Sequence, residues 1–306
     1  MKFPLSSIRE RCLATLAYFD LFDYPLTLHE LQTYFLGEQP THDELKFFLM
    51  ADKDLIQHQD GYYFLKGRDF ILVTREQREK ISKNYWKKAR FFLPFLQFVP
   101  FLKMVGICNT LAINNASKES DIDLFIVAKT GRLFFVRFLT VALFTILGVR
   151  RHGSKIAGRF CLSFYTDESA LNLEKIQSGD DDIYLPFWVL TMKPIYGRET
   201  YEKFVRENFW VHNYFGRTLS LPQSFGNTNI LRFFAWLKEL LWRGKWGDAI
   251  EKKLQAAQMK RHQRNLAGLP SEASIAVSEH MLKFHNIDRR KDIAERFERR
   301  MKELLS

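Results

Sequence analysis

Two aspartates in the segment 121–127, which reads DIDLFIV, are the residues of this 306-residue chain best placed to do chemistry. Side chains alternate between the two faces of a strand, so Asp121 and Asp123 are expected on the same face. Two adjacent carboxylates repel each other and are costly to bury unless a cation lies between them. Mg²⁺ commonly takes one or two carboxylates together with substrate phosphates, so the pair predicts a Mg²⁺ or Mn²⁺ site.

The residues before this pair supply its context. Met104–Cys108 is predicted to be a strand, a polar turn follows, and a second strand begins near Asp121. Asn109 and Thr110 directly follow the first strand, and Ser120 directly precedes the pair. An Asp-x-Asp pair alone also occurs at solvated strand ends, so it is the strand–turn–strand arrangement that favours a site.

This arrangement resembles the nucleotidyltransferase superfamily, which includes DNA polymerase β, the CCA-adding enzymes and small antibiotic and toxin–antitoxin nucleotidyltransferases. Members usually show a strand, Gly-Ser or Gly-Gly, a connecting run, and Asp-x-Asp on the next strand. Here Asn109-Thr110 stands where Gly-Ser normally lies, and the run 120–124, SDIDL, matches the second part. The resemblance is specific over about 103–127 and extends less specifically to Trp210.

The resemblance implies an α/β (α+β) fold with a nucleotidyltransferase-type mixed sheet and flanking helices. Its members transfer a nucleoside monophosphate from a nucleoside triphosphate to an acceptor, with release of pyrophosphate. Asp121 and Asp123 would hold Mg²⁺, while Asn109, Thr110 and Ser120 would contact the nucleotide. Catalysis in such a site is mostly positioning and charge stabilisation.

Active members of this superfamily carry a third carboxylate on the strand after the next helix. Ser163, in the predicted strand Phe160–Thr166, is the best match for that place and is not a carboxylate. Asp167 and Glu168 follow at the end of the strand, and either would have to reach the metal from the loop. Two-metal catalysis would be compromised without the third group. A second function therefore stays open: a catalytically inactive nucleotidyltransferase-like protein that binds nucleotide or nucleic acid, or serves as a scaffold.

The rest of the chain divides into further segments. Residues 1–70 predict three helices and a β-hairpin around Asp60-Gly61, the layout of a winged-helix-like domain. Thr27–Glu30 and Thr41–Glu44 predict capping boxes. The third helix begins with acidic residues, which favours protein contact or packing over DNA binding. The predicted division is a winged-helix-like domain (1–70), a linking helix (71–103), a nucleotidyltransferase-like domain (104–218) and a C-terminal helical region (230–306).

The net charge of +11 favours a polyanionic partner, such as nucleic acid, nucleotide phosphates or an anionic membrane surface. Cations gather on the predicted helix Thr74–Phe92 and in the loop Val149–Arg159, although both are also compatible with solvated surfaces. Both a nucleic acid and a protein remain open as the acceptor.

The cysteines and one apolar run bear on location. Three scattered cysteines form neither a disulfide framework nor a zinc pattern, which predicts a reducing, cytoplasmic setting. The apolar run Leu133–Val149 is short for a membrane span and contains Arg137, so a buried helix is predicted.

Overall fold

The structure is a computed structural model, and it describes residues 6–179, 182–217, 219, 236–266, 274–285 and 289–305. The first part of the chain, the N-terminal module, comprises residues 8–65. Its elements are α1 (Ile8–Asp20), β1 (Leu26–Thr27), α2 (Leu28–Thr33), α3 (His42–Ala51), β2 (Ile56–Gln59) and β3 (Tyr62–Leu65). The three strands form a small antiparallel sheet in the order β1-β3-β2.

Local sequence signals explain this module. Thr27 and Thr41 each accept a hydrogen bond from the backbone three residues on, so both predicted capping boxes are present. Asp60 and Gly61 both have positive φ, 53° and 81°, as a tight hairpin turn between β2 and β3 requires. The predicted three helices and hairpin are therefore confirmed as elements.

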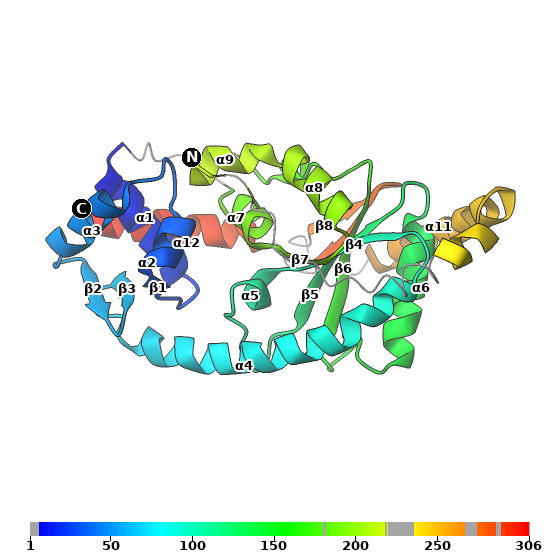
Figure 1. The fold of residues 1–306 in the computed structure, drawn as a ribbon, viewed down its shortest axis with the longest axis horizontal. Coiled ribbons are helices and arrows are strands. Elements are labelled where there is room, and N and C mark those ends of the chain that lie inside the picture. The colour runs from blue at the N-terminus through cyan, green and yellow to red at the C-terminus, as the bar shows by residue number, and fades with distance from the viewer. Residues whose placement is uncertain are drawn as a thin grey trace.

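A long helix joins this module to the rest of the molecule. α4 (Phe70–Phe92) runs from the N-terminal module along the central sheet, and a 3-10 turn (Leu93–Phe98) leads from it into the first strand of that sheet (Figure 1). The predicted helix Thr74–Phe92 is confirmed and begins four residues earlier than its first predicted residue.

A six-stranded mixed sheet forms the centre of the molecule, in the order β7-β4-β5-β6-β9-β8. β5 runs parallel to β6 and antiparallel to β4. The fold is thus of mixed α/β type, as predicted. The strands are β4 (Leu102–Ile107), β5 (Ile122–Ala128), β6 (Phe160–Asp167), β7 (Lys193–Tyr196), β8 (Ser274–Val277) and β9 (Met281–His285).

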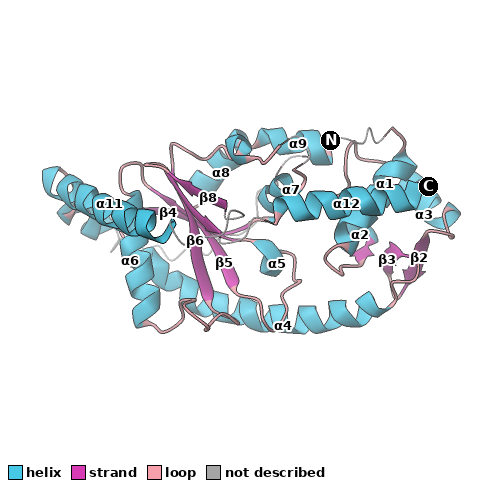
Figure 2. Cartoon of the chain, turned by 180° about the vertical axis from the view of Figure 1, so that it is seen from behind, coloured by secondary structure: helices cyan, strands magenta, loops and turns pink. Residues whose placement is uncertain are grey.

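Helices cover both faces of this sheet (Figure 2). Leu124 and Ile126 of β5 are buried in one core with residues of α4 and α6, while Phe125 and Val127 are buried in a second core on the opposite face. This alternation is the strand periodicity of two. The helices after α4 are α5 (Asn109–Ala112), α6 (Leu133–Ile146), α7 (Tyr184–Thr191), α8 (Arg198–Glu207), α9 (His212–Phe215), α11 (Lys245–Leu266) and α12 (Arg290–Leu305).

The second core is shared between the sheet and the N-terminal module. Tyr18 and Phe19 of α1 both lie edge-on to Phe187 of α7, with ring centroids 5.2 Å apart in each pair. Phe297 of α12 closes the same cluster, because α12 runs back beside α1 (Figure 1). Burial of these rings fixes the N-terminal module against the sheet.

The prediction that the C-terminal region is helical was wrong over 274–285. This part of the predicted helical region 230–306 instead contains the hairpin β8–β9. β9 pairs with Phe164–Thr166 of β6, which would otherwise present unpaired backbone groups at the edge of the sheet. A short apolar run is compatible with both the helical period of 3.6 and the strand period of two. Pairing with the edge of β6 gives this segment its strand structure.

The apolar run predicted to be a buried helix forms α6, of which Leu133, Phe134 and Phe144 are fully buried. Gly148 has φ of 66° and ends this stretch. Among the described residues, no helix combines the length and apolar character needed to cross a membrane.

Candidate functional site

The two aspartates lie together at the start of β5. Asp121 immediately precedes this strand and Asp123 is its second residue, and both side chains are half-buried. Ile122 between them is fully buried on the opposite face. The predicted shared face of the two carboxylates is therefore present, and it borders solvent at the edge where β5 begins.

The turn after β4 brings a polar side chain onto this pair. Asn109 opens α5 with φ of 57°, a left-handed conformation that asparagine tolerates and glycine prefers. Its amide Nδ2 donates a hydrogen bond to Asp123 Oδ2 at 2.7 Å. Its Oδ1 accepts one from the Tyr184 hydroxyl at 3.1 Å. The backbone thus has the conformation that glycine would supply there, and the asparagine side chain occupies the space beside Asp123.

Thr110 and Ser120 flank this arrangement. The Thr110 carbonyl accepts a hydrogen bond from the Asn115 N–H at 2.7 Å, which closes the turn. The Ser120 hydroxyl accepts one from the Ser117 N–H at 2.9 Å. Both residues are half-buried and lie next to the aspartate pair in the chain or in space. Their contact with nucleotide phosphates stays a prediction.

Burial and mutual repulsion make the Asp123 carboxyl unusually easy to protonate. Burial and, after it, the neighbouring Asp121 charge together raise the pKa of Asp123 from 3.8 to about 6. The hydrogen bond from Asn109 partly opposes this rise in pKa. A cation placed between the two carboxylates would remove the cause of the shift.

Cys161 of β6, and not the Ser163 singled out from the sequence, is the third side chain of the group that could hold a metal ion with Asp121 and Asp123. In the parallel pairing of β5 and β6, Cys161 stands opposite Asp123. The register then shifts, so that Phe125 pairs with Phe164 and β6 holds one residue more than β5. Such a bulge is invisible in the sequence. Ser163 lies beside the cysteine and accepts a hydrogen bond from its Sγ at 3.2 Å.

Asp167 and Glu168 lie at the far end of β6, so neither supplies a carboxylate to the pair. Asp167 pairs with Ala128, which lies roughly 16 Å along β5 from Asp123. Its buried carboxylate accepts hydrogen bonds from Ser169, and it lies 2.9 Å from His280 Nδ1. These contacts hold the turn that follows β6.

One arginine of the basic loop reaches the site. Arg151 Nη1 lies 2.6 Å from Asp121 Oδ2 and 3.7 Å from Cys161 Sγ. The Arg151 side chain is 40% exposed, whereas that of Asp121 is 15% exposed. A partly exposed cation therefore neutralises part of the charge of the pair. The sequence pointed to this loop but not to this one arginine.

Further cations of this region lie in segments that contact Tyr85 of α4. The Tyr85 hydroxyl donates to the Lys118 carbonyl at 3.0 Å, and its ring lies against Gly158 of the basic loop. Lys88 lies close to Arg159, and Lys118 and Lys155 belong to the two segments that contact Tyr85. The cations Lys88, Lys118, Lys155 and Arg159 are grouped here as the basic surface. Burial lowers the pKa of Lys88, and the nearby Arg159 lowers it further. No ion pair to Lys88, Lys118 or Lys155 occurs within the described part of the chain.

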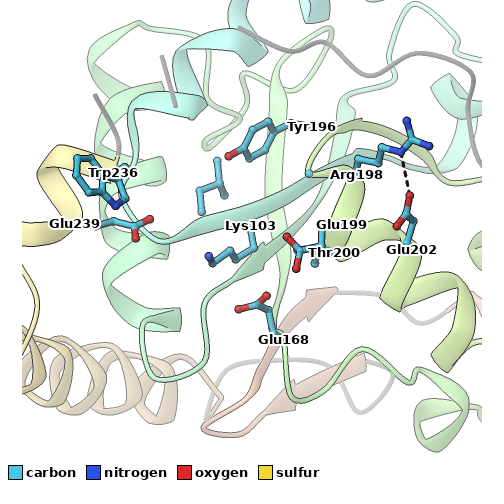
Figure 3. A pocket seen from close by; sticks show the side chains of 11 residues that line it. Lys103, Glu168, Tyr196, Arg198, Glu199, Thr200, Glu202, Trp236 and Glu239 are labelled. Carbon is cyan, nitrogen blue, oxygen red and sulfur yellow. Dashed lines mark hydrogen bonds and ion pairs between the residues drawn. The ribbon is translucent and has the colours of Figure 1, made fainter. Parts of the chain in front are cut away.

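A separate pocket of about 500 Å³ lies at the other end of β4 (Figure 3). Lys103, at the start of that strand, lines it, whereas Cys108 at the opposite end donates its N–H to the Asp123 carbonyl. Glutamates predominate among its charged side chains, which would repel a triphosphate. The charged residues that line it are Lys103, Glu168, Arg198, Glu199, Glu202 and Glu239.

Comparison of the chain with protein-family models, with curated proteins and with solved structures finds no match. The function is therefore argued from the geometry of the site.

Proposed function

We propose that this protein is a metal-dependent nucleotidyltransferase that acts at the start of β5. The observation that carries the proposal is the pair Asp121 and Asp123, held on one face beside the left-handed turn at Asn109. The pKa of Asp123 is raised, and the pair borders solvent. Both features favour binding of a cation together with its anionic ligand. A nucleoside triphosphate with Mg²⁺ or Mn²⁺ fits both requirements.

The donor chemistry is compatible with Mg²⁺. Two carboxylates within reach of each other match the usual protein share of a Mg²⁺ site, and substrate phosphates complete it. Asp121 and Asp123 would hold the ion, which when bound neutralises charge on the triphosphate. Arg151 is placed to leave Asp121 and pair with a phosphate, because its side chain is partly exposed. Asn109 would keep Asp123 oriented.

A nucleic acid is the acceptor that the surface favours. The basic surface lies beside Asp121, joined to it through Ser120, whose carbonyl accepts the Gly158 N–H at 2.8 Å. Its cations would neutralise backbone phosphates and hold an acceptor end near the aspartates. The net charge of +11 acts in the same direction.

A winged-helix-like role in protein contact is proposed for the N-terminal module. Its third helix, α3, exposes Phe47 and Met50, each 69% accessible, next to the acidic pair Asp43 and Glu44. Apolar and acidic side chains suit a protein partner and oppose a phosphate backbone.

A second candidate is a protein that binds the nucleotide without transferring it. Cys161 in the third position and Arg151 on Asp121 favour this alternative, because a thiol and a guanidinium replace groups that transfer requires. Nucleotide binding is common to both candidates, and only the transfer step separates them.

The test is calorimetry with each of the four ribonucleoside triphosphates, with Mg²⁺ and with chelator. Binding should require Mg²⁺ and fall at least about tenfold in Asp121→Asn/Asp123→Asn, because the metal ligands are lost. Glu119→Gln, which changes an exposed carboxylate close by, is the matched control and should bind normally. Labelled transfer to RNA then separates the candidates: product supports the transferase, and binding without product supports the second candidate. Absence of any Mg²⁺-dependent nucleotide binding would contradict both candidate functions.

A further inference from the structure

The third side chain at the aspartate pair changes which metal the site prefers. One ligand atom from each of Asp121, Asp123 and Cys161 lies within 4.8 Å of the others. Asp123 and Cys161 lie directly opposite each other on neighbouring parallel strands, and Asp121 immediately precedes the first of these strands. Rigid strands hold ligands more exactly than loops do, so the three form a prearranged donor set.

The donor set combines hard carboxylate oxygens with a soft thiolate sulfur. Mg²⁺ is a hard ion that takes oxygen ligands, whereas thiolate ligands select Zn²⁺ and related ions. A tetrahedral Zn²⁺ site, with Zn–S of about 2.3 Å and Zn–O of about 2.1 Å, holds its ligand atoms about 3.5 Å apart. The 4.8 Å limit observed without an ion requires only small side-chain rotations to reach that geometry. Three protein ligands would leave a fourth position open for a phosphate oxygen.

We propose that Cys161 is a metal ligand beside Asp121 and Asp123, and that the site therefore prefers a thiolate-binding divalent ion such as Zn²⁺ to Mg²⁺. The inference rests on the proposed function in that it uses the same two aspartates. On binding, the thiol releases its proton to solvent and the sulfur forms the bond to the metal. The hydrogen bond from Cys161 to Ser163, 3.2 Å long, is lost in that step.

Arg151 occupies the position of the cation in the metal-free protein. Its Nη1 contacts both Asp121 and Cys161, at 2.6 and 3.7 Å, so the guanidinium already lies among the donors. Metal entry requires this side chain to swing out, which its 40% exposure allows. Arg151→Ala should therefore raise metal affinity severalfold, the opposite of its expected effect on phosphate binding.

The experiment is titration of the full chain with Co²⁺ in the absence of nucleotide. Sulfur ligation gives a near-ultraviolet charge-transfer band, which reports the bond directly and does not depend on activity. We expect the band in the wild type and its loss in Cys161→Ser, with Co²⁺ affinity reduced about 100-fold and Mg²⁺ affinity far less. Zn²⁺ should displace Co²⁺ and remove the band.

Cys12→Ala is the matched control, because it removes a buried thiol of α1, remote from the site, and should keep the band. Three outcomes are distinguishable. A band that Cys161→Ser abolishes and Cys12→Ala retains supports the proposal. Mg²⁺-dependent nucleotide binding without any cobalt–sulfur band overturns it and leaves the proposed function intact. Absence of Co²⁺ and Zn²⁺ binding, together with absence of Mg²⁺-dependent nucleotide binding, overturns both.

Discussion

At the scale of single residues, the metal-free protein should be destabilised by its own site. The pKa of Asp123 is raised in the folded chain, from 3.8 to about 6, first by burial and then by Asp121. Folding therefore favours the protonated carboxyl, and stability falls as the pH rises from about 4 through 6. In the presence of a chelator, Asp123→Asn should be more stable than the wild type at pH 8, by about 1–3 kcal/mol.

Urea unfolding at pH 8 and at pH 4 measures this difference. The gain should be present at pH 8 and absent at pH 4, where the wild-type carboxyl already carries its proton. Glu119→Gln, at an exposed position, should gain nothing at either pH. A gain of equal size at both values would mean that charge at Asp123 is not its origin.

Asn109 provides a second test at the residue scale. Its φ of 57° is strained for most side chains, and its amide joins Asp123 and Tyr184. Asn109→Gly and Asn109→Ala both lose these hydrogen bonds, but only alanine bears the cost of the left-handed conformation. Asn109→Ala should therefore be less stable than Asn109→Gly by about 1–2 kcal/mol in urea unfolding. Equal stability would show that the turn relaxes to negative φ.

The site was predictable from sequence where the chemistry is local. The spacing of Asp121 and Asp123 within one strand fixes their common face, and Asn109 follows directly from the strand before it. Cys161 was missed because its position depends on the pairing of β5 with β6 and on the bulge after it. Register between strands far apart in sequence is set by packing, which no short motif records.

At the scale of elements, a buried ion-pair network joins the N-terminal module to α4 and to the turn of the site. Arg75 of α4 is buried, lies 2.7 Å from Glu30 and stacks on the ring of Tyr24 at 3.8 Å. The Tyr24 hydroxyl in turn donates to the Ile113 carbonyl at 2.9 Å, in the turn that follows α5. The N-terminal module therefore helps to position the residues beside Asp123.

Loss of Glu30 should destabilise the protein in a pH-dependent manner. Burial alone would raise the pKa of Glu30, but Arg75 and the hydrogen bonds lower it below 4.5. The ionised pair thus stabilises the fold above about pH 4.5, and this stability is lost as the pH falls through the lowered pKa. Glu30→Gln should cost about 1–3 kcal/mol at pH 7, since it leaves the buried Arg75 with Glu79, 2.7 Å from its Nε, as its remaining ion-pair partner among the described residues, and less at pH 3.

Thermal and urea unfolding of Glu30→Gln at the two pH values provide the measurement. Glu76→Gln is the control, because Glu76 forms an exposed pair with Lys80 on the same helix at 2.6 Å and its loss should change stability far less. A cost for Glu30→Gln that does not change between pH 7 and pH 3 would assign it to packing.

Elements differ in how far the sequence determined them. α4 and α6 were predicted because long apolar periodicity leaves little choice, and the turn at Asp60-Gly61 because its φ values admit few residues. The hairpin β8–β9 was not predicted, because a short segment of mixed polar and apolar residues takes its structure from the strand it pairs with, here β6. Its strands satisfy the edge of β6, which is formed more than a hundred residues earlier in the chain.

At the scale of the whole molecule, the excess of 46 lysines and arginines over 35 acidic residues is expected to drive binding to nucleic acid. A specific RNA-binding surface differs from a general effect of net charge in that its cations must lie at one place, beside the site. The basic surface borders Asp121, while α11 packs against α6 and carries exposed lysines of its own. Removing equal charge from the two places separates these explanations.

Binding of a single-stranded RNA should therefore be measured at a series of salt concentrations. Lys88→Ala/Lys118→Ala/Lys155→Ala should weaken it and reduce the slope of log K against log salt by about 2, because each lysine lost releases about 0.7 of a counterion less. The control Lys252→Ala/Lys253→Ala/Lys260→Ala removes the same charge from α11 and should change the slope by much less. Equal effects of the two triple variants would mean that net charge alone attracts the RNA. The proposal that the basic surface holds the acceptor would then be wrong.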